Sequence, residues 1–128
     1  MAFSNRLKSE SFIASVDLNT SQFHIVDLAN VAHKVTIGAA AGGFGVLQNK
    51  PLAGEHATVA VEGITKCSAG AAIAVGDYIT SAASGYASVV TSGGSTKKAP
   101  GRALTAAASG SVFPLEIDRF VSAATLAI

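Results

Sequence analysis

The chain has 128 residues, one cysteine and a net charge of +1, and only 13% of its residues are charged. This length predicts one domain with a modest core, and the single cysteine excludes an intrachain disulfide. The only adjacent basic pair is Lys97-Lys98, so the clustered basic surface that nucleic-acid binding requires is absent from the sequence. So few charges leave much of the surface to small residues, which favours burial against other subunits.

Short runs of alternating hydrophobicity follow a polar N-terminal segment. Residues 1–11 are polar and of mixed charge, and we expect a flexible arm there. Residues 12–18, 22–28 and 34–38 carry the apolar patterns that predict β-strands. No apolar run approaches the about 20 residues of a membrane span, and the N-terminus lacks the apolar stretch of a signal peptide. We therefore expect a soluble protein made in the cytoplasm.

A glycine-rich segment, residues 38–56, interrupts these strands. Its glycines disfavour a helix and its Pro51 disfavours a central strand, so we expect a long loop. Loops of this length in small domains tend to be functional. The segment is not a phosphate-binding loop, because no Gly-Lys-Ser/Thr follows it and no G-x-G-x-x-G occurs within residues 38–54.

Strand patterns resume at residues 57–67. Residues 69–75 then predict one or two turns of helix, which would end before Gly76 because glycine is favoured just past a helix end. Gly76 and Asp77 form a predicted structural turn. Glycine tolerates positive φ there, and aspartate accepts hydrogen bonds from nearby backbone.

A hairpin at Gly85 and a last strand at residues 112–118 complete the predicted elements. Pro114 cannot donate to a sheet, so we expect this strand to lie at an edge or to carry a bulge. Turn signals recur every 8 to 12 residues or so, which indicates a small barrel or sandwich. We expect a mainly β fold, a single β-barrel or sandwich domain over residues 12–128 with one short helix, and we detect no internal repeat.

Few residues are spaced for catalysis or metal binding. His24, His33 and His56 lie too far apart for the usual pairs of metal ligands. We expect His24 to be a hydrogen-bonded, partly buried residue of an apolar strand. Cys67 is expected to be a small buried hydrophobic residue, and no G-x-S-x-G nucleophile motif is present. We therefore predict no enzymatic activity, no metal and no cofactor.

Four motifs in a fixed order carry a family resemblance. They are GVLQNKPLAG at residues 45–54, GITK at 63–66, AGAAIAVGD at 69–77 and GRAL at 101–104. As a set they resemble the small capsid cement, or decoration, proteins of tailed bacteriophages. The resemblance covers roughly residues 20–118, and Cys67 stands where a small aliphatic residue is expected.

The resemblance implies a β-barrel-like protomer that assembles as a homotrimer. It implies a structural virion protein, made in the host cytoplasm, which binds the outside of the expanded capsid and clamps neighbouring major capsid protein subunits. It implies no catalysis and no nucleic-acid, membrane or small-molecule partner.

The resemblance also directs attention to the loop at residues 42–54 as an interface. Its apolar anchors would be Phe44, Leu47 and Pro51, while Gln48 and Asn49 would hydrogen-bond backbone groups. The expected contact residues, on the capsid or on another protomer, are Phe3, Phe12, Phe44, Val46, Leu47, Gln48, Asn49 and Pro51. In the alternative interpretation, Leu47 only holds the loop against its own barrel, because an apolar loop residue can serve either purpose.

Two other functions remain open. A virion-associated or tail-associated β-module could bind glycans, although the chain has no tryptophan and both Tyr78 and Tyr86 lie in strand patterns. The segment around Lys66 is also similar to lipoyl-type and biotinyl-type carrier barrels, which present a lysine on a tight hairpin.

Overall fold

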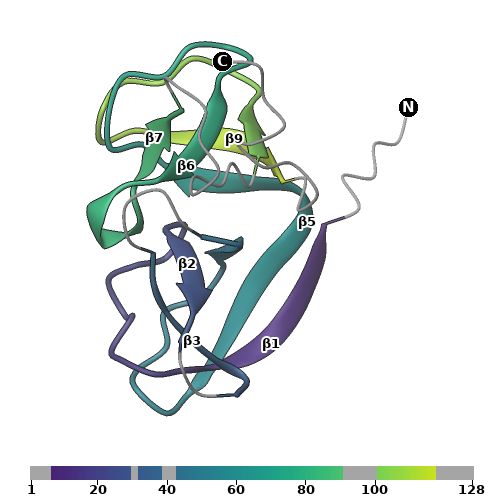
Figure 1. The fold of residues 1–128 in the computed structure, drawn as a ribbon, viewed down its shortest axis with the longest axis vertical. Coiled ribbons are helices and arrows are strands. Elements are labelled where there is room, and N and C mark those ends of the chain that lie inside the picture. The colour runs from purple at the N-terminus through teal and green to yellow at the C-terminus, as the bar shows by residue number, and fades with distance from the viewer. Residues whose placement is uncertain (1–6, 30–31, 39–42, 91–100, 118–128) are drawn as a thin grey trace.

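The computed structural model describes residues 7–29, 32–38, 43–90 and 101–117. Strands dominate this part of the chain (Figure 1). They are β1 (Lys8–Ala14), β2 (Ile25–Leu28), β3 (Lys34–Ile37), β4 (Gly45–Leu47), β5 (His56–Ser68), β6 (Tyr78–Ser81), β7 (Ala87–Val89), β8 (Gly101–Ala103) and β9 (Val112–Ile117). A single 3-10 turn, η1, spans Ala83–Gly85. Across the described ranges, no helix has the length and apolar character to cross a membrane.

The first half of the chain closes into a small barrel. The strand order is β1-β3-β2-β4-β5, and β5 also pairs with β1, which completes the ring. Alternating residues of these strands point inward and exclude water, as the period of two requires. The barrel interior contains Ala14, Leu18, Val26, Val35, Leu47, Ala57, Val59 and Val61. The predicted mainly β fold with a barrel is therefore confirmed.

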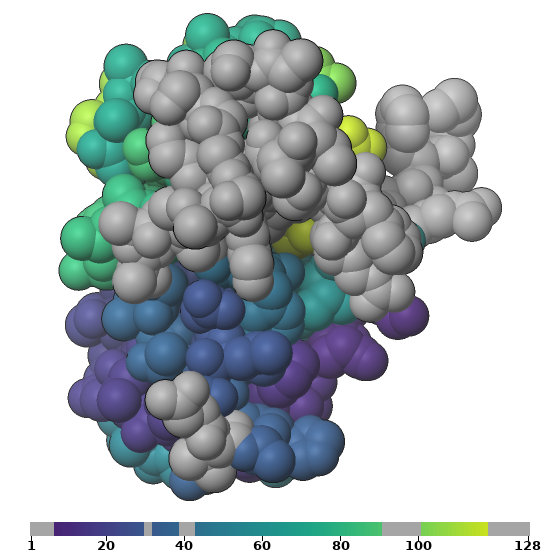
Figure 2. Space-filling model, viewed as in Figure 1, coloured from purple at the N-terminus to yellow at the C-terminus, as the bar shows by residue number. Residues whose placement is uncertain are grey.

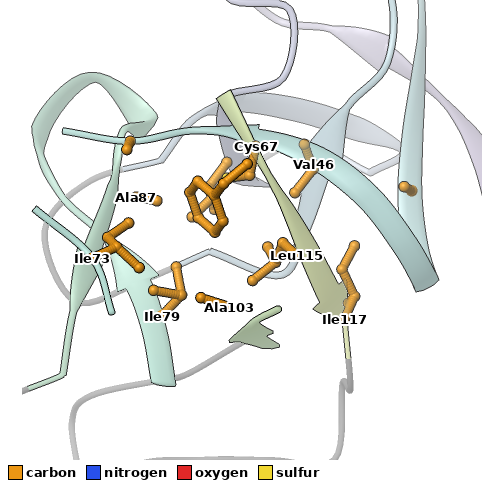
Figure 3. Packing of buried hydrophobic residues seen from close by; sticks show 12 residues of the cluster. Val46, Cys67, Ile73, Ile79, Ala87, Ala103, Leu115 and Ile117 are labelled. Atoms are coloured by element: carbon orange, nitrogen blue, oxygen red, sulfur yellow. The ribbon is translucent and has the colours of Figure 1, made fainter. Parts of the chain in front are cut away.

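The long strand β5 leaves the barrel and begins a second sheet. Its residues up to Glu62 pair with β1, and those from Gly63 onward pair with β9. The second sheet continues in the order β5-β9-β8-β6-β7 and lies above the barrel in Figure 1. Its core, shown in Figure 3, includes Val46, Cys67, Ile73, Ile79, Leu115 and Ile117. Val46 belongs to barrel strand β4, so the two halves share apolar contacts.

The second sheet contains an internal repeat that the sequence does not reveal. The pairing of Cys67 with Phe113 in β5 and β9 has its counterpart in the pairing of Gly101 with Ile79 in β8 and β6. Cys67 corresponds to Gly101, and Ile79 corresponds to Phe113, so each residue lies 34 positions from its counterpart. The two segments that repeat in this way are related by approximate two-fold symmetry.

The loops between these strands repeat the same hydrogen bonds. Gly76 N–H donates to Ala103 O at 2.8 Å, and its counterpart Gly110 N–H donates to Ala69 O at 2.8 Å. Ile73 and Ala107 exchange two bonds, at 2.8 and 2.9 Å. The expectation of no repeat was wrong, because the similarity lies mainly in alanines and two turn glycines, which are common residues.

The predicted helix at residues 69–75 is wrong. The N–H groups of Ala69, Gly70 and Ile73 donate to Ser111, Ala87 and Ala107 instead of to the preceding helical turn. Tertiary pairing has therefore overridden the helix propensity of alanine. The helical residues of the described chain lie at η1 instead.

Two predicted boundaries also differ from the structure. Residues 8–11 of the predicted arm belong to β1 and pair with β5, for example Glu10 with Val59. Their polar side chains are exposed to solvent, so the polar sequence of this segment is compatible with a strand. Leu7 is partly buried and packs against the core of the second sheet, and residues 1–6 of that arm lie outside the described residues. Within the predicted loop 38–56, Gly45–Leu47 form β4 between β2 and β5.

Strand β9 is not an edge strand, which corrects the expectation based on Pro114. It pairs with β5 on one side and with β8 on the other. Pro114 O accepts a hydrogen bond from Leu104 N at 3.1 Å, just past the last β8 pair, Ala103 with Leu115. The N and C=O of one residue in an antiparallel strand point the same way. The missing N–H therefore faces the end of β8, where the ladder stops.

Candidate functional site

Most large apolar residues of the predicted interface loop point into the protein, whereas Leu52 is 47% exposed. Val46 and Leu47 have no exposed area, and Pro51 is buried. Phe44 is half-buried, and its ring meets the Phe12 ring edge-on, with the centroids 5.4 Å apart. Leu47 packs in the barrel core and Val46 in the core of the second sheet, so these side chains stabilise their own protomer, as in the alternative interpretation of Leu47. Phe3 lies outside the described residues.

Gln48 and Asn49 fasten this loop to the strand that follows it. Gln48 Nε2 donates to Val46 O at 3.1 Å and to Thr65 Oγ1 at 2.8 Å. Asn49 Nδ2 donates to His56 O at 2.9 Å, and Asn49 Oδ1 accepts from Thr58 N at 3.1 Å. The predicted hydrogen bonds to backbone are present, and they fix the loop against β5.

The Gly76-Asp77 turn has the predicted geometry. Gly76 has φ +84°, which glycine adopts without a Cβ clash. Asp77 Oδ2 accepts from Ala74 N at 2.8 Å. Arg102 supports the same turn, because its Nε donates to Gly76 O at 3.4 Å and its guanidinium lies 4.9 Å from the Tyr78 ring centroid.

The remaining candidate residues have structural surroundings. His24 is 8% exposed, shares a 2.8 Å hydrogen bond between its Nδ1 and Ser84 O, and packs against Tyr86. The predicted hydrogen bond and burial are confirmed, but His24 lies just before β2 and not within a strand. Lys66 lies within β5 opposite Pro114 and not on a tight hairpin, which removes the feature on which the carrier interpretation depends. Within the described ranges, no three or more His, Cys, Asp or Glu residues are grouped to hold a metal ion.

Cys67 lies in the core of the second sheet (Figure 3). Burial disfavours the charged thiolate and raises the pKa of Cys67 to about 12, although a hydrogen bond with the Ser68 backbone opposes the shift. Since the thiolate is the nucleophilic form, this thiol is neutral and shielded at physiological pH.

Sequence reasoning missed the surface formed by the two repeated loops. We call residues 69–76 and 103–112 the double-loop tip. It contains no Asp, Glu, Lys or Arg. Val75, Leu104 and Val112 are 69%, 40% and 51% exposed. The two loops run side by side along the upper left of Figure 1, and their teal and yellow-green atoms form the upper left rim in Figure 2. The signal available in the sequence was the absence of charged residues from both stretches, whose corresponding residues lie 34 positions apart.

A larger hollow lies elsewhere, where the barrel meets the second sheet. Its volume is about 430 Å³. Tyr86, Asp17 and Thr20 are among the residues that line it. Tyr86 is 38% exposed, with its ring centroid 4.4 Å from that of His24.

Comparison with known proteins places the chain in a family. A family model described as phage cement protein matches residues 17–117. The crystal structure of the head fiber gp8.5 N base in bacteriophage phi29 has a similar fold, with a TM-score of 0.66 and 18% sequence identity. That similarity covers 91% of this chain and 97% of the phi29 chain. A search of curated proteins finds no match. The family match spans most of the chain, which therefore belongs to the phage cement protein family.

Proposed function

We propose that this protein binds the outside of the expanded phage capsid and stabilises it by clamping neighbouring major capsid protein subunits. The observation that carries this proposal is the match to the cement family over residues 17–117. The protein acts as a non-catalytic homotrimer on the virion surface. Attachment at several points lets individually weak contacts give durable binding.

The structure supports a role as a rigid structural element. The barrel and the second sheet share β5 and apolar core contacts. Loop residues that the sequence suggested for the interface instead stabilise the protomer: Val46, Leu47 and Pro51 are buried. A clamp transmits force between subunits, and a β-framework with fixed loops resists deformation because interiors are close-packed. In this proposal, exposed residues make the capsid contacts.

Binding to capsids tests the proposal directly. Purified protein is sedimented with expanded, undecorated capsids of the source virus, and the bound copies per capsid are quantified. We expect saturable binding at a copy number equal to, or a simple fraction of, that of the capsid protein. The decorated capsids should also withstand higher temperature before releasing DNA. Absence of binding by folded protein would contradict the proposed function.

A glycan-binding module is the second candidate, and the junction hollow favours it. Exposed aromatic rings beside carboxylate and hydroxyl groups suit sugars, which present both apolar faces and hydroxyls. Tyr86, Asp17 and Thr20 supply these groups. A glycan array would reveal this activity, and loss of the signal in Tyr86→Ala would assign it to the hollow. Capsid binding without glycan binding would exclude this second candidate.

A further inference from the structure

The double-loop tip has the properties of a preorganised contact surface. Its loops hold each other through six backbone hydrogen bonds of 2.8–2.9 Å. They pair Ala69 with Gly110 and Ser111, Ile73 with Ala107, and Ala103 with Gly76 and Asp77. Such pairing restricts the backbone before any partner binds, and preorganisation lowers the entropic cost of association. Exposed apolar side chains on a fixed backbone are therefore presented in one arrangement.

Two similar hollows flank the bridge between Ile73 and Ala107. One has a volume of about 230 Å³ and includes Val75, Gly76, Ala103 and Leu104 in its lining. The other has a volume of about 240 Å³, and its lining includes the repeat counterparts of those residues, Ser109, Gly110, Ala69 and Gly70. The internal repeat has thus produced two matching depressions on one surface.

The two hollows differ in chemistry. Val75 and Leu104 give the first an aliphatic rim, whereas in the second their counterparts are Ser109 and Gly70 and the large side chain of the lining is the Tyr86 ring. Arg102 and Glu116 border the first hollow on its strand side. The Arg102 guanidinium is already engaged with Tyr78 and Gly76 O. The first hollow is therefore the one suited to receive an apolar side chain.

We propose that the double-loop tip is the capsid-binding surface, and that the hollow between Val75 and Leu104 receives an apolar side chain from an uncharged surface segment of the major capsid protein. This inference rests on the proposed function and adds the residues that make the contact. The two loops of the tip carry no charge, and the Arg102 and Glu116 that border the hollow belong to β8 and β9. A partner segment without charge fits these loops, since an unpaired charge buried against them would be destabilising. Apolar side chains in well-packed pockets dominate the energetics of most interfaces.

The size of the tip favours the capsid over a second copy of this chain. A standard stable interface uses about 20–30 residues on each side, and the two loops, residues 69–76 and 103–112, are shorter than that together. A contact this small is too weak to hold an isolated pair of protomers. On a capsid the same contact is repeated by each protomer of an assembly, and avidity compensates for its size.

The experiment compares two tip variants with a matched control in the co-sedimentation assay. Val75→Asp and Leu104→Asp each place a charge in the apolar rim. Leu28→Asp places one at a leucine at the end of barrel strand β2 whose exposure lies between those of Leu104 and Val75. Leu28 is 58% exposed, so all three variants should fold, and their melting temperatures verify this. We expect at least a tenfold weaker capsid affinity for both tip variants and less than a twofold change for Leu28→Asp.

Each other result has a distinct meaning. If the unaltered protein binds capsids and both tip variants bind equally well, the tip assignment is overturned while the proposed function stands. If the unaltered protein does not bind capsids at all, both the tip assignment and the proposed function are overturned. Analytical ultracentrifugation of the same variants tests the second-copy alternative. A change in oligomeric state with unchanged capsid affinity would assign the tip to self-association and overturn the capsid assignment.

Discussion

The loop at residues 43–54 and the double-loop tip have opposite roles in the fold. Both contain three glycines and a few larger apolar side chains. In the first, Leu47 and Pro51 are buried in the protomer that carries them. In the second, Val75 and Leu104 are exposed at the surface. The apolar character of a loop residue therefore does not predict whether its side chain is buried or exposed.

Backbone pairing accounts for the difference. The first loop includes β4, whose pairing with β2 and β5 makes alternate side chains face the barrel interior. The tip loops pair mainly with each other, and Ile73 at their centre fills the core beneath them. The side chains that flank Ile73 are left outside. Substitutions in the two loops test this contrast, and the pH response of Cys67 tests the core beneath the tip.

Leu47→Ala should give the largest loss of stability. Removal of a fully buried leucine leaves a cavity and costs about 3 kcal/mol of unfolding free energy. Urea unfolding followed by circular dichroism measures it. Val75→Ala is the matched control, because Val75 is exposed and its loss should change stability by about 0.5 kcal/mol or less. Equal losses at the two sites would contradict the contrast between the loops.

Phe44→Ala should destabilise the barrel by about 2 kcal/mol, less than a fully buried aromatic residue would, because Phe44 is half-buried against Phe12. The measurement is the thermal midpoint together with capsid co-sedimentation at a temperature where the variant is folded. We expect a lower midpoint and unchanged attachment. Weakened attachment with an unchanged midpoint would instead make Phe44 a contact residue.

Gly76→Val and its repeat counterpart Gly110→Val should have similar effects. Both glycines have positive φ, +84° and +88°, and a β-branched residue in that conformation is strained by roughly 1–2 kcal/mol. Chemical denaturation of both variants measures the loss. Asparagine tolerates positive φ better, so Gly76→Asn and Gly110→Asn should recover part of it. A large effect at only one position would show that the two turns are not equivalent.

Cys67 should make stability fall by about 1 kcal/mol between pH 8 and pH 10. Its folded pKa of about 12 lies above the unfolded value of 9.0, so in this range the unfolded chain loses the thiol proton while the folded chain retains it. Unfolding is then favoured as pH rises. The comparison of wild type with Cys67→Ala at both pH values isolates this contribution from other groups. An identical pH dependence in the two proteins would contradict it.

Several features of the fold were predictable because they depend on local rules. Apolar patterns at residues 22–28, 34–38 and 57–67 predicted strands that correspond to β2 (Ile25–Leu28), β3 (Lys34–Ile37) and β5 (His56–Ser68). The Gly76-Asp77 turn followed from the conformational freedom of glycine. The hydrogen bonds of Gln48 and Asn49 to nearby backbone are also short-range. The helix at residues 69–75 failed because alanine-rich segments favour a helix only when no partner strand competes for their N–H groups.

By itself, the sequence determined the mainly β class, the inert surroundings expected for Cys67 and His24, and the set of motifs that resembles the cement proteins. Only the tertiary structure decided which apolar loop faces inward, that β9 is paired on both sides, and that two weakly similar segments form one symmetric tip. These properties depend on which backbone groups pair across long sequence separations. That pairing is set by the competition among all strands for the same partners, which no short window of residues contains.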